Sequence, residues 1–453
     1  MPNANTLASS VEASVLATIE KISAHENQLH SVAQRIDDIA RADASRCDAL
    51  TQAGSHAGSL HGLQFAVKDI IDVAGVPTRS GSLTRSDHPP ATTDATVVAK
   101  LRAAGAVPVV KTNTVEFALG GWGTNQTVGT PHNPWDMNTP RVPGGSSSGT
   151  GVLVGSGLLL AGLGTDTGGS VRIPAAFCGC VGLKTSIGLV SRAGVTPLSE
   201  TLDTVGPLTQ SVATSAAMLA AMQGSDPLDP STRDVQKVDP ISSLNRGNQG
   251  LRLGVLPYEA MPDLSGEMRE SFELAKRLLL DSGVTLADCS LPMSLAEYQR
   301  QGGVISAVEG YSTYGHLVDD PDSAMATPNR ERMRLGGTVP ASELVKIWRT
   351  RQQAITDFEH VIGDFDAIIL PSTPATAMPI AEVDESNMSM SSHTRFANYL
   401  ALAALSVPIG LSKTGLPTSL QIVVRRFADP LALRIGAAFE QVRGRLPLPE
   451  FSG

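Results

Sequence analysis

The sequence predicts an α/β protein built from layers of helices and strands. Short apolar stretches typical of buried strands alternate with segments of helical period along most of the 453 residues. Apolar residues make up 42% and charged residues 17% of the chain, which is enough core-forming material for a large globular protein. Glycine (43 residues) and proline (29) are abundant and aromatic residues scarce (4%), which favours a loop-rich fold over a coiled coil.

The N-terminal segment 7–40 is predicted to be helical. Aliphatic residues recur there at helical spacing, at Val11, Val15, Ile19 and Ile22. Ser9 or Ser10 is a suitable N-cap, because a serine hydroxyl accepts hydrogen bonds from the N–H groups of a first helical turn.

Strands and helices then alternate. The apolar stretch in "LQFAVKD" predicts a strand that ends at Lys68, and a helix over Ala95–Ala104 leads into a strand over Val107–Val110. The segment Gly120–Gly149 is a long loop rich in glycine, asparagine, threonine and proline. Because it carries little charge, a functional role is favoured over disorder.

The remaining elements continue the same alternation. A helix is expected from about Gly151 and a strand near Leu160–Leu163. Later strands are predicted at Leu251–Val255, Ala367–Leu370 and Leu420–Val424. Later helices are predicted at Glu267–Leu280, Ala341–Ile362 and Leu431–Gln441. The segment 326–340 predicts a mobile surface excursion, and no low-complexity linker divides the chain.

Charge and cysteine content exclude several classes of function. The net charge is −9 and no Lys/Arg run is present, so nucleic acid is not expected as a direct ligand. No apolar run is long enough for a membrane span, and no basic leader precedes an apolar block. Only four cysteines occur, which indicates a reducing cytoplasm. The pair Cys178 and Cys180 is a weak metal signal, since buried thiols are more common.

A serine placed after two glycines is the first candidate for chemistry. In "TDTGGS", Ser170 follows Gly168 and Gly169. Glycines can turn successive N–H groups toward one point, which is what an oxyanion hole requires beside a nucleophile. The alternative is a tight turn in which Ser170 only fills space.

Two further features carry competing interpretations. The stretch 145–149 matches the G-x-S-x-G nucleophile elbow, but "NTPRVPGG" before it does not predict the strand that an elbow needs. Lys68 and Lys111 each end an apolar strand, where a solvated surface lysine is common. A buried lysine, however, loses its proton readily and then serves as a general base.

Many spaced motifs together resemble the amidase signature family over nearly the whole chain. They are "GLQFAVKDIIDVAGVPTRSGS", "AAGAVPVVKTNTVEFALGG", "PHNPWDMNTPRVPGGSSSGTG", "LGTDTGGSVRIPAAFCGCVGLKTSIGLVSRAG", "LDTVGPLTQSV" and the closing "GLPTSLQIVVRRFADPLALRIGAAFE". The resemblance implies a single amidase-signature domain over 1–453 with a central mixed β-sheet covered by helices on both faces. Its parts would be the N-terminal helical segment, a signature core at about 61–225 and a C-terminal α/β part at about 250–445.

The resemblance also implies a Ser–Ser–Lys triad, which falls on Ser170, Ser146 and Lys68. The two serines are 24 positions apart, which matches the family pattern and selects Ser146 over Ser147 and Ser148. In the family, the bridging serine follows a cis peptide bond.

Further roles follow from the same resemblance. The residues expected to form the oxyanion hole are Thr167, Gly168, Gly169 and Ser170. Ser147 is expected to orient Lys68, while Asp166 and Arg172 are expected to hold the loop.

The expected activity is hydrolysis of a carbon–nitrogen bond in a small amide through a Ser170 acyl-enzyme. No metal or organic cofactor is implied. Gly121, Trp122 and Asn125 are candidates for the substrate pocket, whereas Trp135 is expected to pack within its loop.

Other functions stay open at this point. The alternatives are a carbamate or urethane hydrolase with the same triad, the glutaminase subunit of a tRNA-dependent amidotransferase, and a binding protein with a relic site. Self-association into a homo-oligomer is also left open.

Overall fold

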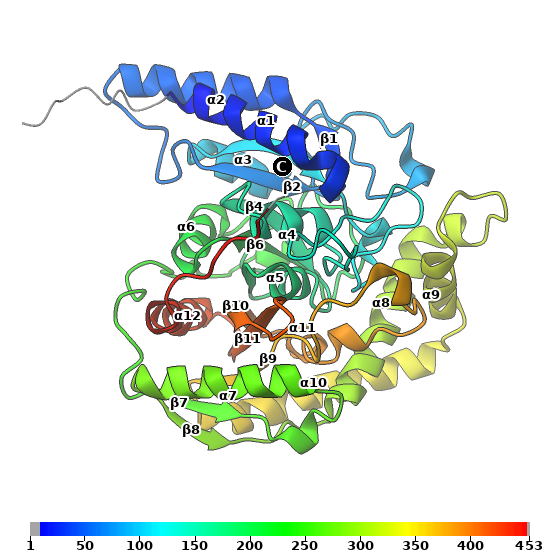
Figure 1. Ribbon diagram of the computed structural model, residues 1–453. Helices are drawn as coiled ribbons and strands as arrows, with labels where there is room; N and C mark the ends of the chain where they lie inside the picture. The colour runs from blue at the N-terminus through cyan, green and yellow to red at the C-terminus, as the bar shows by residue number, and fades with distance from the viewer. Residues whose placement is uncertain (1–9, 451–453) are drawn as a thin grey trace, which may run out of the picture.

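One mixed β-sheet of 11 strands organises residues 10–450, which are the residues that the computed structural model describes (Figure 1). The strands lie in the order β1-β3-β2-β4-β6-β5-β10-β11-β9-β7-β8 across the sheet. Their bounds are β1 Val32–Arg35, β2 Gln64–Lys68, β3 Val107–Thr112, β4 Ala161–Asp166, β5 Val181–Lys184, β6 Thr204–Thr209, β7 Arg252–Val255, β8 Thr285–Asp288, β9 Ala367–Pro371, β10 Ala403–Leu411 and β11 Pro417–Val424.

The sheet has parallel pairings toward both ends and an antiparallel centre. β2 runs parallel to β3 and β4, and β7 runs parallel to β8 and β9. The strands between them, from β4 through β6, β5, β10 and β11 to β9, pair antiparallel. The sheet therefore joins the N-terminal and C-terminal halves of the chain directly, where β5 pairs with β10.

Helices cover both faces of the sheet. Their bounds are α1 Val11–Leu29, α2 Asp37–Gln52, α3 Thr96–Ala103, α4 Ser148–Gly155, α5 Arg172–Cys178, α6 Val212–Met222, α7 Gly266–Asp281, α8 Leu295–Val318, α9 Thr327–Gly337, α10 Ala341–Gly363, α11 Arg395–Tyr399 and α12 Asp429–Arg443. Every residue of α4 is buried, as expected of a helix that is apolar on all sides. α4 and α5 pack together over one face, while α6 and α12 pack together over the other. The predicted fold class is confirmed.

Elements with a strong local apolar pattern match the predictions well. The expected strands near residues 251, 367 and 420 are β7, β9 and β11, and the expected helices after residues 267, 341 and 431 are α7, α10 and α12. Ser10 caps α1, since its hydroxyl accepts a hydrogen bond from the Ala13 N–H at 3.0 Å. Ser9 and the start of the predicted segment 7–40 lie outside the described residues.

The expectation of one helical segment through residue 40 is wrong. α1 ends at Leu29, and His30 takes the left-handed conformation with φ 50°. The carboxylate of Glu26 then accepts hydrogen bonds from the Val32 N–H and the Ser31 hydroxyl, both at 2.9 Å, which closes a turn into β1. β1 pairs antiparallel with β3, a partner that local periodicity does not reveal.

The segment 326–340 is also different from the prediction, because it forms α9 packed against α8. Met333 is fully buried there, and the Asn329 side chain donates to the Glu116 carbonyl at 2.8 Å. The polar composition of this segment reflects its outer face, whereas three buried residues anchor it to the fold. Within the described residues, no helix is both long enough and apolar enough to cross a membrane.

Lys111 is not a solvated surface lysine. Its side chain is fully buried, and its ammonium lies 2.8 Å from the Asp69 carboxylate, which is also buried. It also donates to the Thr78 hydroxyl at 2.8 Å and the Pro77 carbonyl at 3.2 Å. This buried ion pair links β3 to the turn that follows Lys68.

We expect Lys111→Met to lower the free energy of unfolding by about 3–5 kcal/mol, because it leaves the Asp69 carboxylate buried without its partner. Urea denaturation followed by circular dichroism measures the change. The control is Lys413→Met, which removes a solvent-exposed pair with Glu270 and should leave the transition where it was. Equal transitions for wild type and Lys111→Met would contradict the assignment.

Candidate active site

The amine of Lys68 lies in the interior, at the end of β2. Its neighbours β3 and β4 flank it on both sides, and the residue has no solvent exposure. Nζ lies 2.7 Å from the Ser146 hydroxyl oxygen and 2.8 Å from the Thr165 hydroxyl oxygen. The structure thus joins two residues that are 78 positions apart in the chain, as the resemblance implied.

Burial lowers the pKa of Lys68 to about 7, because the ammonium form loses hydration inside the protein. The carboxylates of Asp203 and Asp166 act in the opposite direction and raise it. The amine is therefore substantially neutral at physiological pH. A neutral amine keeps a lone pair that can accept the proton of the Ser146 hydroxyl.

The bridging hydroxyl is held by an unusual backbone. The peptide bond between Gly145 and Ser146 is cis. The Ser146 carbonyl accepts hydrogen bonds from the Thr114 hydroxyl at 2.8 Å and from the Val115 N–H at 3.2 Å. These contacts fix the segment that leads into α4 and aim the Ser146 side chain at Lys68.

Ser147 does not contact Lys68 directly. Its hydroxyl lies 3.3 Å from both the N–H and the carbonyl of Thr165, and Thr165 supplies the hydroxyl that touches the Lys68 amine. Gly164 permits this approach, since a Cβ there would lie only 2.6 Å from the Ser147 hydroxyl oxygen. Ser147 is thus linked to the Lys68 amine only indirectly, through Thr165.

Ser170 follows the loop after β4, just before α5. Its carbonyl accepts a hydrogen bond from the Ser147 N–H at 3.2 Å, which joins the two serine segments through their backbones. The residue is 7% exposed and lines a small pocket. The other lining residues include Gly120, Gly121, Thr167, Gly168, Ile173, Ser306, Ser391 and Arg395.

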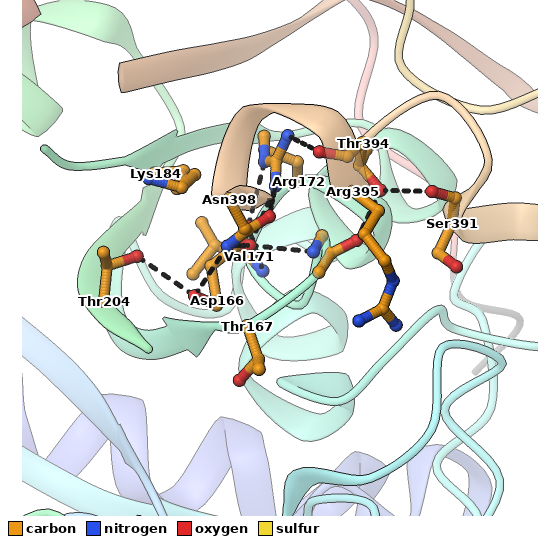
Figure 2. Close-up of polar contacts among 12 residues, drawn as sticks. Asp166, Thr167, Val171, Arg172, Lys184, Thr204, Ser391, Thr394, Arg395 and Asn398 are labelled. Carbon is orange, nitrogen blue, oxygen red and sulfur yellow. Dashed lines mark hydrogen bonds and ion pairs between the residues drawn. The ribbon is translucent and has the colours of Figure 1, made fainter. Parts of the chain in front are cut away.

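Asp166 and Arg172 form a fully buried ion pair beneath this loop (Figure 2). Arg172 donates to the two Asp166 carboxylate oxygens at 2.8 and 2.9 Å. Burial alone would raise the pKa of Asp166, but the Arg172 charge and hydrogen bonds hold it well below its usual range. The carboxylate is therefore ionised and pairs with the guanidinium at every ordinary pH.

The same pair fixes the loop and ties it to distant segments. The carboxylate accepts hydrogen bonds from the Gly169 N–H at 2.7 Å and the Val171 N–H at 3.2 Å. Arg172 also donates to a set of acceptors near the C-terminus: the Thr394 carbonyl, the Asn398 side chain and the Gln421 side chain.

The Gly169 N–H points to Asp166, which corrects its expected place in the oxyanion hole. The N–H groups of Thr167, Gly168 and Ser170 have no acceptor within the described part of the chain. The Thr167 hydroxyl makes a short hydrogen bond to the Asp203 carboxylate. Three of the four expected donors thus have no hydrogen-bond acceptor among the described residues.

Two of the three candidates for the substrate pocket lie elsewhere. Trp122 packs in a small core with Ile173 and Met390, and its indole N–H donates to the Asn387 carbonyl at 2.8 Å. Asn125 is buried and donates to two backbone carbonyls outside the pocket. Gly121 alone lines the pocket of Ser170.

Other residues named from the sequence have structural surroundings. The Trp135 indole donates to the Cys178 carbonyl at 2.8 Å, so Trp135 packs against the end of α5 and not within its own loop. Cys178 and Cys180 are buried free thiols. No cluster of three or more His, Cys, Asp or Glu side chains within residues 10–450 is placed to hold a metal ion.

Three polar residues near the site were missed by the sequence analysis: Thr165, Asn398 and Arg395. Thr165 lies in "LGTDTGGS", beyond the strand predicted near 160–163, whereas β4 extends through it to Asp166. Asn398 donates to the Asp166 carbonyl and carboxylate at 3.0 and 2.9 Å. Arg395 and Asn398 could have been noticed in the sequence, because they are polar residues inside the mostly apolar stretch "TRFANYLALAALSVPIG".

A larger cavity adjoins the pocket of Ser170. It has a volume of about 480 Å³ and borders the Asp203 carboxylate. Ala118, Thr167 and Leu198 line both spaces. The two spaces are therefore neighbours that share part of their walls.

A buried amine, a hydroxyl beside it and a serine-lined pocket at the ends of two inner strands of a mixed sheet are typical of a hydrolytic α/β enzyme. The chain belongs to the amidase family, whose model, described as Amidase, matches residues 13–433.

Individual relatives are similar over almost their whole length. A glutamyl-tRNA(Gln) amidotransferase subunit of Anaeromyxobacter sp. (strain K) is 37% identical, over 96% of this chain and 93% of the relative. The native peptide amidase of Stenotrophomonas maltophilia is 27% identical with a TM-score of 0.86, covering 98% of this chain and 96% of that one. A chain from a vestigial protein complex bearing on the evolutionary origins of an s-triazine catabolic enzyme is 29% identical with a TM-score of 0.90, covering 97% and 96%.

Proposed function

We propose that the protein hydrolyses the carbon–nitrogen bond of a small amide through an acyl-enzyme on Ser170. The observation that carries this proposal is the 2.7 Å contact between the Lys68 amine and the Ser146 hydroxyl, in the interior and beside the loop of Ser170. A lysine with a pKa near 7 is a suitable base for this chemistry at neutral pH.

In the proposed mechanism, the Ser170 oxygen attacks the carbonyl carbon of the amide. Its proton passes to Ser146, whose own proton passes to the Lys68 amine. The N–H groups of Gly168 and Ser170 hold the negative charge that develops on the carbonyl oxygen. The protonated Lys68 then returns a proton through Ser146 to the nitrogen, and the carbon–nitrogen bond breaks. Water attacks the ester by the same route and releases the acid and Ser170.

We expect Ser170→Ala, Ser146→Ala and Lys68→Met each to lower kcat by about 10⁴-fold or more, because residues of one proton relay act as a unit. Ammonia release from butyramide measures the rate, and circular dichroism checks that each variant folds. A fluorophosphonate should label Ser170 of the wild type, as read by mass spectrometry of the peptides. Unimpaired turnover by Ser170→Ala would end the proposal.

The pH dependence provides a second test. The base must be neutral, so kcat/KM should rise with pH, about tenfold per unit below an apparent pKa of about 7, and level off above it. Lys184 is the matched control: burial also lowers its pKa to about 7, but its amine donates to the backbone carbonyls of Thr185 and Leu402. A folded Lys184→Met protein should keep the inflection. A flat profile in the wild type from pH 5 to 9 would contradict the role of Lys68.

A second candidate is the release of ammonia from glutamine by this chain as part of an amidotransferase complex. It is favoured by the 37% identity to a subunit of such an enzyme. It needs the same acyl-enzyme on Ser170, and it adds an acceptor of ammonia and partner subunits. A carbamate substrate is a third candidate, since the same serine can attack a carbamate carbonyl. The expected cytoplasmic location and the oligomeric state stay predictions.

The candidates differ in substrate preference. The purified chain alone should hydrolyse simple primary amides, with kcat/KM for glutamine no higher than for the best amide of a matched panel. Ammonia release is measured for each amide, and matched carbamates are assayed beside them. A kcat/KM for glutamine at least ten times that of every other amide would favour the amidotransferase role instead.

A further inference from the structure

The pocket of Ser170 contains an arginine without a counter-ion. Arg395 begins α11 and lines this pocket together with Ser170. Its Nη1 lies 3.3 Å from the Ser306 hydroxyl oxygen, and its buried Nε has no hydrogen-bond partner. Within residues 10–450 it forms no ion pair. The Ser306 hydroxyl is therefore its one hydrogen-bond acceptor among the described residues, and Nη2 has none there.

The guanidinium lies directly against Gly168, one of the residues expected to form the oxyanion hole. A Cβ on Gly168 would lie 2.6 Å from the Arg395 Cζ and 2.8 Å from its Nη2, so a side chain there would have to displace the guanidinium. On the other side, a Cβ on Gly302 would lie 2.9 Å from the Arg395 Cδ. The side chain is thus held between two glycines, next to the place where the carbonyl of the substrate would bind.

The Arg395 side chain is not part of the neighbouring ion pair between Asp166 and Arg172. In Figure 2 the guanidinium points away from Asp166, Arg172 and Asn398, and no dashed line joins it to them. Asp166 already accepts hydrogen bonds from Arg172, so it has no free oxygen directed at a second arginine. Burial lowers the pKa of Arg395 to about 10, and it remains a cation at neutral pH.

A half-buried cation without a partner is costly for a protein, because its lost hydration is not compensated. The residues that line the pocket include this one cation and no acidic side chain. Arginine presents its donors in a planar fork that matches the two oxygens of a carboxylate. A carboxylate of the substrate would therefore supply the missing partner.

We propose that Arg395 binds a carboxylate on the acyl part of the substrate, so that the preferred substrates are amides that carry a carboxylate and no ammonium group. This inference rests on the proposed reaction at Ser170 and names its substrate class. An α-amino acid amide side chain such as that of glutamine fits less well, because its ammonium group would enter a pocket whose one charged side chain is a cation.

The test compares monoamides of dicarboxylic acids with neutral amides of the same length. The pairs are malonamate and propionamide, succinamate and butyramide, and glutaramate and valeramide. We expect the wild type to prefer the carboxylate member of the best pair by at least tenfold in kcat/KM. Arg395→Met should lower that ratio by about 30-fold or more, since it removes one partner of a desolvated charge pair. Arg395→Lys should restore part of the ratio.

Arg300→Met is the matched control. Arg300 lies on α8 and pairs with Glu297, at the surface and outside the pocket. Its replacement should leave the ratio of the two kcat/KM values as in the wild type. A change in the ratio for Arg300→Met as large as for Arg395→Met would overturn the specific role of Arg395.

Binding is measured separately from turnover. In Ser170→Ala, calorimetry should detect succinamate or one of its two homologues, and Ser170→Ala with Arg395→Met should bind it at least 30-fold more weakly. This arm tests the inference even if the reaction proposed for Ser170 is wrong. Equal binding by the two proteins would overturn the inference, and so would a wild type that prefers the neutral amides. The reaction proposed for Ser170 would still stand in either case if the fluorophosphonate labels Ser170 and the protein hydrolyses amides.

Discussion

The exclusion of water from the Lys68 amine is the constraint on which the site depends. β3 and β4 flank the end of β2, and α4 covers it, so the amine has only hydroxyl groups as polar neighbours. One strand away, the buried Lys111 ammonium has a carboxylate partner, Asp69, at 2.8 Å, although burial still lowers the pKa of Lys111. The two lysines end neighbouring parallel strands at the same edge, and their different partners give them different chemistry.

The second organising element is the contrast between two arginines near the loop of Ser170. Arg172 is enclosed, satisfied by Asp166 and by acceptors from the C-terminal segments, and therefore part of the framework. Arg395 starts from the same C-terminal region but is turned toward the pocket without an anion. Arg172 thus stabilises the glycine-rich loop, whereas Arg395, beside the same loop, is the arginine proposed to bind the substrate.

The sequence was most informative where local pattern and local structure agree. The strands β7, β9 and β11 are dense in aliphatic residues, and the long amphipathic helices show a clear period. β5 and β6 were not predicted because "VGLK" and "TVGPLT" contain glycine, proline and threonine, and they become strands through their place in the sheet. The contact between Lys68 and Thr165 spans 97 residues, and the pocket joins Ser170 to Arg395, so no local spacing reveals either. The catalytic assignments of the serines and the lysine came from the resemblance to a family. The residues alone did not decide whether Ser170 only fills a tight turn or whether Lys68 is a surface lysine.

The reach of Arg172 sets an order of events during synthesis. Its acceptors Thr394, Asn398 and Gln421 lie 222, 226 and 249 residues further along the chain. Until that stretch has been synthesised, Arg172 lacks these three acceptors, and only its local pair with Asp166 can form. The loop that carries Ser170 therefore gains its full set of side-chain contacts only after the segment from Thr394 to Gln421 has been synthesised.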